Sequence, residues 1–161
     1  MDRRPDRTLP PDENARALAR GLLATARHAA LAVTDAQTGT PAISRIAFGL
    51  DDADVPLALV SALAPHRAAL EVRPDCAFMV GEPGDKGDPL THPRLMVQAR
   101  ASFADPAERP VLRVRWLALH PKAAVYADLP DFAFVRLVPV AATLNGGFAR
   151  AYRLTPADLR P

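Results

Sequence analysis

The sequence is poor in the residues that build several common kinds of site. Cys76 is its only cysteine in 161 residues, so no disulfide is possible within the chain. Cys76 begins an apolar run and is expected in the core, and a reducing cytoplasm is the expected location. The four histidines have no second histidine or cysteine at metal-ligand spacing, so no metal centre is expected. The sequence also lacks a Walker loop and a Gly-x-Ser-x-Gly nucleophile motif.

Lysine, aromatic side chains and long apolar runs are also scarce. Lys86 and Lys122 are the only lysines, aromatics make up 6% of the chain, and the net charge is only +2. Basic residues form no cluster or stripe, which argues against nucleic-acid binding. A few fixed arginines suit a small anionic ligand instead. No apolar run reaches the length of a membrane span, and the charged stretch 1–7 is not followed by a signal-peptide core.

Short elements closed by prolines dominate the sequence, which is 49% hydrophobic and contains 17 prolines. We predict one domain over residues 1–161, with a flexible arm over 1–10 and a loop over 82–92. His28 is expected to cap the first helix. Helices are predicted at 15–26, 66–72 and 106–119, with a further turn at 122–126. Strands are predicted at 29–34, 41–49, 56–61, 76–81, 93–103, 132–144 and 148–154. This order predicts a mainly β fold, an antiparallel barrel with a few peripheral helices.

The junction between the strand at 56–61 and the helix at 66–72 carries an unusual set of side chains. Ser61 ends the strand, and His66 and Arg67 begin the helix. A hydroxyl, a guanidinium and the free backbone amides of a helix start are the groups that bind phosphate. An ordinary strand–helix corner with a solvated arginine and histidine would have the same sequence. Both interpretations remain open on this stretch alone.

Acidic pairs such as Asp51-Asp52 fall in predicted turns, and no catalytic side chain can be identified. Chemistry supplied by a bound cofactor therefore fits the sequence better than acid–base catalysis by the protein itself.

Several stretches together resemble one protein family. They are Ser44–Gly49, Ser61–Arg67, Arg94–Gln98, His92-Pro93-Arg94-Leu95 and Gly146–Ala151. Their order and spacing, over residues 12–158, resemble the pyridoxamine 5′-phosphate oxidase-like proteins, and in particular the haem-utilisation branch of that family. The resemblance implies the FMN-binding split-barrel fold and a homodimer with FMN in the groove between the protomers.

The resemblance also implies roles for individual residues. Arg45 and Arg67 would bind the FMN phosphate, with Ser61 and His66 as further donors. The backbone of 46–48 would follow the isoalloxazine edge, Arg94 would reach the flavin of the other subunit, and the segment 145–150 would close the site. The implied cofactor-binding residues are Arg45, Ile46, Ala47, Phe48, Ser61, Leu63, His66, Arg67, Arg94, Gln98, Asn145, Phe148 and Arg150.

The sequence departs from the family pattern at two places. Gly49-Leu50 replace a lysine of the oxidase, and the basic clamp for the substrate phosphate is missing, so we do not expect oxidation of pyridoxamine phosphate. Longer haem-utilisation proteins continue into a second domain, whereas this sequence stops at Pro161. We therefore expect weak or no specific haem binding and no haem cleavage. His92, in the Gly/Pro-rich loop, could swing toward a ligand, although Pro93 stiffens its backbone.

Three functional hypotheses follow. The first is an FMN-dependent oxidoreductase of unassigned substrate, acting as a homodimer in which Trp116 and Phe134 contribute to the interface. The second is a non-catalytic protein that stores or senses flavin or haem. The third is a split barrel that binds neither ligand.

Overall fold

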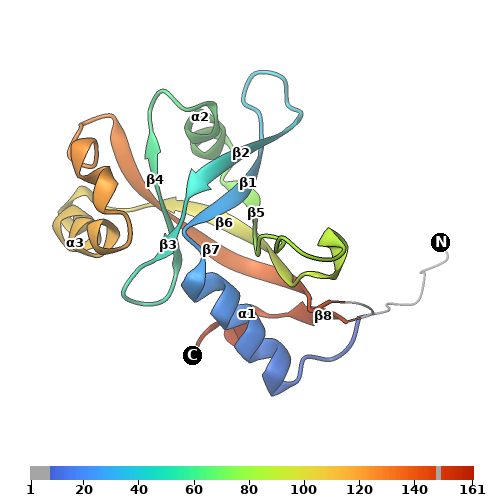
Figure 1. Cartoon of the computed structure of the whole chain (residues 1–161). Helices are drawn as coiled ribbons and strands as arrows, with labels where there is room; N and C mark the ends of the chain where they lie inside the picture. The colour runs from blue at the N-terminus through green and yellow to red at the C-terminus, as the bar shows by residue number, and fades with distance from the viewer. Residues whose placement is uncertain (1–7, 148–149) are drawn as a thin grey trace.

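A computed structural model describes residues 8–147 and 150–161. An antiparallel sheet of eight strands curls into a half-open barrel, with the strand order β2-β1-β5-β6-β7-β4-β3 and with β8 beside β7 (Figure 1). The predicted split barrel with peripheral helices is thus confirmed. The strands are β1 (His28–Thr34), β2 (Pro41–Ala47), β3 (Gly49–Leu50), β4 (Pro56–Ser61), β5 (Asp75–Val80), β6 (Arg94–Phe103), β7 (Phe132–Asn145) and β8 (Ala151–Leu154). The helices are α1 (Glu13–Thr25), α2 (Pro65–Val72) and α3 (Arg109–Leu119), with 3-10 turns η1 (Pro89–Thr91), η2 (Pro106–Glu108), η3 (Pro121–Val125) and η4 (Pro156–Leu159).

Alternation along the strands separates the barrel interior from an outer face. In β1, Ala29, Leu31 and Val33 are buried, whereas the residues between them are partly exposed. The buried set continues through β5, β6 and β7 and is covered by α1 and by Leu70 of α2. This core holds the barrel together and fixes which side chains of each strand face outward.

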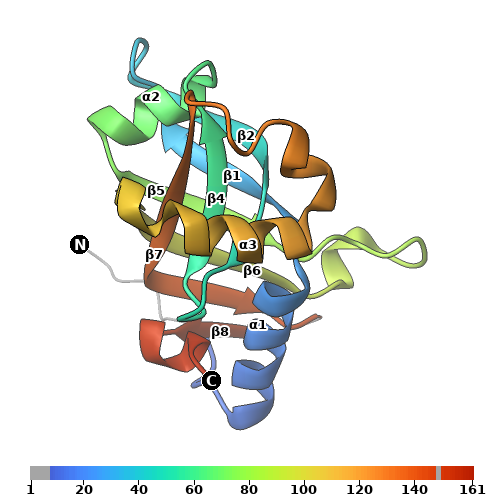
Figure 2. The same cartoon turned by 90° about the vertical axis from the view of Figure 1, so that its left-hand side faces the viewer.

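A second, smaller core lies under α3, which crosses the outside of β4 and β7 (Figure 2). Trp116 and Phe134 meet edge to face in it, with ring centroids 5.9 Å apart. Trp116 is 1% exposed and Phe134 is 3% exposed. The prediction that these two residues contribute to a dimer interface is therefore wrong, because the protomer's own α3 already covers them.

Helix boundaries follow the capping residues. Asp12 caps α1 by accepting a hydrogen bond from the Ala15 amide at 2.8 Å. The helix predicted from residue 106 begins as the 3-10 turn η2, stabilised by a capping box between Asp105 and Glu108, and becomes α-helical only at Arg109. The extra turn predicted after α3 is present as η3.

Several predicted boundaries need correction. The strand predicted over 41–49 ends at Ala47, because Phe48 turns its ring into the core and Gly49 pairs with β4 instead. His28 does not cap α1. It is the first residue of β1, and its Nε2 lies 3.0 Å from Glu82 Oε1. The arm predicted over 1–10 is fixed near its end, because the Leu9 amide donates a hydrogen bond to the Ala151 carbonyl at 2.8 Å. Residues 1–7 of the predicted arm lie outside the described residues.

Two predicted features of the later strands are present. β7 is long and irregular at Pro139, where the register between β6 and β7 shifts next to Gln98. The last strand is shorter than predicted, because β8 begins at Ala151 and residues 148–149 are not described.

Candidate functional site

The end of β4 and the start of α2 form a polar corner around Ser61. The Ser61 hydroxyl accepts a hydrogen bond from the Leu63 amide at 3.1 Å, which shapes the turn into α2. The same hydroxyl donates to Asp131 Oδ2 at 2.8 Å. Asp131 lies just before β7, the neighbour of β4 in the sheet. The corner is therefore built from two strands that are far apart in the sequence.

Arg67 reaches the same corner from the first turn of α2. Its Nη1 donates to the Asp131 carbonyl at 2.6 Å and its Nε to Glu71 at 2.9 Å, while its guanidinium lies over the Phe103 ring. Its Nη2 makes no hydrogen bond to any residue that the structure describes. Arg67 also lines a cavity of about 300 Å³ together with Arg109. A half-buried guanidinium with donors to spare is suited to an anionic ligand.

The remaining residues of this corner differ in exposure. Leu63 is 88% exposed and lies at the tip of the turn. His66 is half-buried, and burial lowers the pKa of its imidazole, which is therefore neutral near pH 7. Within 8–147 and 150–161, neither ring nitrogen of His66 has a hydrogen-bond partner. His66 thus keeps both a donor and an acceptor for a ligand.

Strand β2 forms an open edge of the sheet and carries the second group of predicted residues. Arg45 is exposed, and nothing in the described part of the chain pairs with its guanidinium. The side chains of Ile46 and Phe48 are buried, so only their backbone is available to a ligand. The Phe48 amide donates to the Arg27 carbonyl at 2.9 Å. Because bonding alternates along an antiparallel strand, the backbone groups of Arg45 and Ala47 face the open edge instead.

A third group of predicted residues lies on the outer face of the sheet. Arg94 and Gln98 point outward from β6, and Asn145 on β7 is the direct partner of Arg94. Arg94 Nη1 donates to the Leu90 carbonyl at 3.0 Å. Gln98 borders a cavity of about 270 Å³ that also involves Arg153. Within one chain, the predicted residues therefore lie at three separate places: the β4–α2 corner, the open edge of β2, and the outer face of β6 and β7.

The turn after β7 is closed by its own hydrogen bonds. Asn145 Oδ1 accepts from the Gly147 amide at 3.1 Å, and the Gly146 amide donates to the Arg150 carbonyl at 2.7 Å. The Arg150 side chain is exposed. Phe148, predicted to bind the cofactor, lies outside the described residues.

His92 is less available than the sequence suggested. Its Nδ1 accepts from the Gly84 amide at 3.2 Å, and its Nε2 faces the Lys86 carbonyl at 2.9 Å. The prediction that His92 could swing toward a ligand is wrong, because both of its ring nitrogens are bonded within the loop. His120 is also engaged, by the Phe48 carbonyl and by the face of Trp116.

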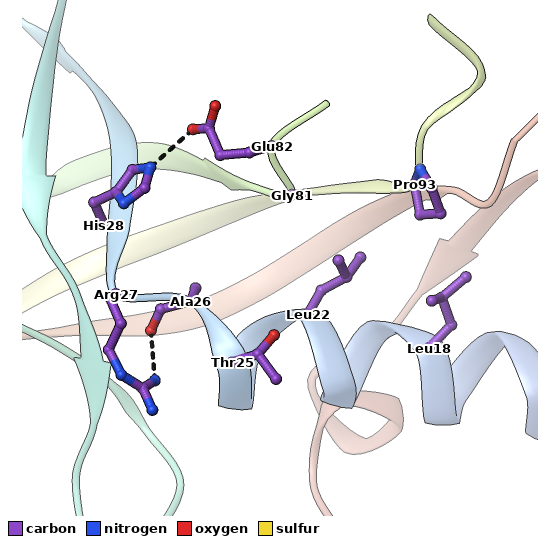
Figure 3. A pocket seen from close by; sticks show the side chains of 9 residues that line it. All are labelled: Leu18, Leu22, Thr25, Ala26, Arg27, His28, Gly81, Glu82 and Pro93. Atoms are coloured by element: carbon purple, nitrogen blue, oxygen red, sulfur yellow. Dashed lines mark hydrogen bonds and ion pairs between the residues drawn. The ribbon is translucent and has the colours of Figure 1, made fainter. Parts of the chain in front are cut away.

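A cavity of about 480 Å³ lies between α1 and the start of β1 (Figure 3). Leu18, Leu22 and Pro93 form its apolar wall, and the pair His28–Glu82 stands at its other side. None of the predicted cofactor-binding residues lines it. In the described part of the chain, no three histidine, cysteine or acidic side chains gather to hold a metal, and no helix is both long and apolar enough to span a membrane.

Sequence reasoning missed Asp131, which contacts both Ser61 and Arg67. Asp131 stands 70 positions after Ser61, and a lone Asp after a proline carries no local signal. Only the pairing of β4 with β7 brings it to the corner. Cys76, expected in the core, is partly buried and packs against it, and burial first and then the charge of Asp75 raise the pKa of its thiol to about 11.

Two solved structures resemble this chain in sequence as well as in fold. One is 46% identical, covers 95% of this chain and 99% of its own, and has a TM-score of 0.86. A protein of unknown function from Agrobacterium tumefaciens is 32% identical, with a TM-score of 0.83, over 98% of this chain and 66% of its own. No protein-family model matches the sequence, and no curated protein matches it either.

More distant structures show the same fold. A haem-binding protein from Mycobacterium smegmatis is 24% identical, with a TM-score of 0.82, over 94% of this chain and 61% of its own. A FAD-binding protein from Mesorhizobium loti is 17% identical, with a TM-score of 0.61, over 77% and 88%. A pyridoxinephosphate oxidase family protein from Clostridium acetobutylicum is 11% identical, with a TM-score of 0.70, over 92% and 99%. The chain therefore has the split-barrel fold of pyridoxamine 5′-phosphate oxidase-like proteins, a fold that it shares with the haem-binding protein from Mycobacterium smegmatis.

Proposed function

We propose that the protein is an FMN-binding flavoprotein that acts as an oxidoreductase in the cytoplasm. The observation that carries this proposal is the pair of arginines with unused donors, Arg67 at the β4–α2 corner and Arg45 on the open edge of β2. Arg136 has a carboxylate partner at each guanidinium nitrogen, whereas these two arginines retain guanidinium nitrogens with no partner among the described residues. The fold similarity to a FAD-binding protein and to a pyridoxinephosphate oxidase family protein agrees with this.

The residues present fit such a cofactor. Arg67 and Arg45 would bind the phosphate, because guanidinium groups form charge-assisted hydrogen bonds with phosphate oxygens. The open-edge backbone at Arg45 and Ala47 would bond the polar rim of the flavin ring. His66 would donate a hydrogen bond while remaining neutral. The flavin, when bound, supplies the hydride or electron transfer, and these residues bind and orient it.

We further propose that the protein works as a homodimer through the outer face of its sheet. Cross-strand partners place Ile43 and Met79 on this face, together with small residues such as Ala77 on β5 and Ala141 on β7. Ile43 is 75% exposed and Met79 is 43% exposed, which leaves an apolar surface open in one chain. A second copy would cover it and would bring a second Arg94 toward the flavin. This face replaces Trp116 and Phe134 as the proposed interface.

The visible spectrum of the purified protein, with and without added FMN, tests the proposal. We expect a flavin spectrum, tighter binding of FMN than of riboflavin, and reduction of the bound flavin by a nicotinamide donor. A protein that binds FMN and riboflavin equally would contradict the proposed phosphate site. Light scattering should give a dimer that Met79→Arg disrupts, while Val114→Arg, an exposed change on α3, should leave it intact.

Haem binding is the second candidate function. It is favoured by the fold similarity to a haem-binding protein and by His66, whose ring nitrogens have no partner among the described residues. Titration with haemin separates the two proposals. The flavoprotein proposal expects no Soret band of fixed stoichiometry. A sharp band lost in His66→Ala and kept in His92→Ala would instead favour a haem-binding protein.

A further inference from the structure

Asp131 occupies the place where the donors of the β4–α2 corner converge. Its Oδ2 accepts from the Ser61 hydroxyl at 2.8 Å. Its backbone carbonyl accepts from the Ala62 amide at 2.7 Å and from Arg67 Nη1 at 2.6 Å. Asp131 therefore already accepts hydrogen bonds from the Ser61 hydroxyl, the Ala62 amide and Arg67, which are donors that a phosphate at this corner would need.

The backbone carbonyl and the side-chain carboxylate of Asp131 have different effects on an anionic ligand. The backbone carbonyl is uncharged, survives any side-chain substitution and holds Arg67 in position. The carboxylate carries the same sign as a phosphate and takes the single hydroxyl hydrogen of Ser61, which cannot be donated twice. A phosphate bound at this corner would thus lie beside a fixed negative charge, where repulsion opposes binding.

We propose that Asp131 determines the specificity of this phosphate site by competing with the ligand for the Ser61 hydroxyl. The inference rests on the proposed function and extends it. Asp131 holds the affinity for the phosphate end of FMN below what Arg67 and Ser61 alone would give. Its charge acts on the phosphate and leaves ring recognition at the β2 edge unchanged.

Flavin titrations of Asp131→Asn test this, since the substitution keeps the shape, removes the charge and leaves only a weaker, neutral acceptor for the Ser61 hydroxyl. We expect FMN to bind about tenfold more tightly to the variant, because a nearby like charge is removed. Riboflavin, which has no phosphate, should bind within about twofold of the wild-type value. Asp128→Asn is the matched control, with the same charge change in the same loop on a residue that pairs with Arg113. It should change neither affinity.

Inorganic phosphate provides a readout that does not depend on flavin. It should raise the melting temperature of Asp131→Asn more than that of the wild type or of Asp128→Asn. An unchanged or weakened FMN affinity in a normally folded Asp131→Asn would overturn this inference, even where the wild type prefers FMN to riboflavin. If the wild type binds no flavin but phosphate stabilises Asp131→Asn selectively, the flavoprotein proposal fails while the competition by Asp131 is supported.

Discussion

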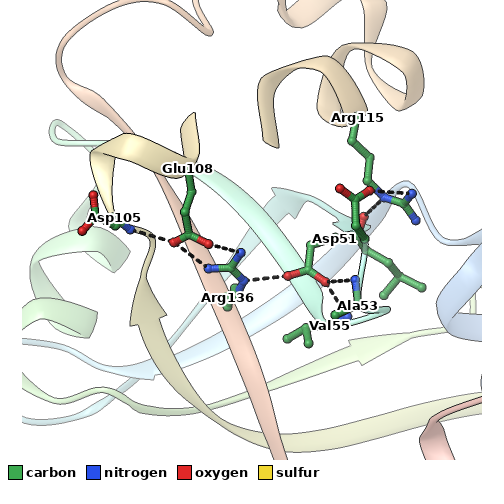
Figure 4. Close-up of polar contacts among 9 residues, drawn as sticks. Asp51, Ala53, Val55, Asp105, Glu108, Arg115 and Arg136 are labelled. Carbon is green, nitrogen blue, oxygen red and sulfur yellow. Dashed lines mark hydrogen bonds and ion pairs between the residues drawn. The ribbon is translucent and has the colours of Figure 1, made fainter. Parts of the chain in front are cut away.

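Arg136 and Arg67 are both half-buried arginines on the barrel, yet their guanidinium groups are used differently. Arg136 donates from Nε to Asp51 at 2.6 Å and from both terminal nitrogens to Glu108, at 3.1 and 2.8 Å (Figure 4). Asp51 is 3% exposed and also accepts from two backbone amides, so every charge in this cluster has a partner. Arg67 is bonded at Nε and Nη1 only, and it borders a cavity.

The difference separates a structural arginine from a binding arginine. The Arg136 cluster joins the turn after β3, the start of α3 and strand β7, and each of the three guanidinium nitrogens of Arg136 donates to a carboxylate in it. The corner around Arg67 retains donors and is partly occupied by Asp131. The comparison predicts that stability depends mainly on Arg136 and that ligand affinity depends mainly on Arg67.

The largest effect is expected from Arg136→Met, which leaves Asp51 charged, buried and without its main partner. Loss of one partner of a buried ion pair costs about 3–5 kcal/mol in the free energy of unfolding. Urea denaturation measures it. The control Arg113→Ala removes an exposed pair with Asp128 and should cost at most about 1 kcal/mol. Similar losses of unfolding free energy in the two variants would mean that the Arg136 cluster stabilises the fold no more than an exposed ion pair does.

A smaller effect, on ligand affinity, is expected from replacing the two arginines proposed to bind the phosphate. Arg67→Ala and Arg45→Ala should each weaken FMN by about 1.5–3 kcal/mol and leave riboflavin nearly unchanged, because only FMN has a phosphate. Fluorescence titration with the two flavins measures this. Arg100→Ala, on an exposed pair with Asp75, is the control. Equal weakening of both flavins would show that Arg67 and Arg45 do not bind the phosphate.

Acid should weaken the Arg136 cluster. Burial alone would raise the pKa of Asp51, but hydrogen bonds from Arg136, Val55 and Ala53 together lower it. The hydrogen bond from Arg136 also lowers the pKa of Glu108. Groups with lowered pKa values stabilise the fold above about pH 4 and lose that contribution as the pH falls further. The free energy of unfolding should therefore drop below about pH 4, and less steeply in Arg136→Met.

The smallest effect is expected where η4 meets α1. The Arg16 hydrogen bond lowers the pKa of Asp158 to about 2, so this contact should lose its contribution between about pH 4 and about pH 2. Asp158→Asn should lower the melting temperature slightly at pH 7. At pH 2 the variant and the wild type should melt at the same temperature. A variant that is as stable as the wild type at pH 7 would show that the contact contributes nothing.

The strands and helices were largely predictable because their signals are local. The alternation in β1, the capping Asp12 and the prolines at helix starts each act within a few residues. The predicted site was incomplete for the opposite reason. Asp131 reaches Ser61 only through the register of β4 with β7, and Trp116 is buried only because α3 folds back over the sheet.

The sequence alone determined an antiparallel barrel with a polar strand–helix corner at Ser61–Arg67, because apolar periodicity and prolines specify elements over a few residues. The split form of the barrel was implied only by the family resemblance. Only the tertiary structure decided which donors remain available there. Arg136 and Arg67 cannot be distinguished by residue type, and neither can His66 and His92. Their roles depend on hydrogen bonds to segments distant in the chain, such as those from Arg67 to the carbonyl of Asp131 and from Arg136 to Asp51.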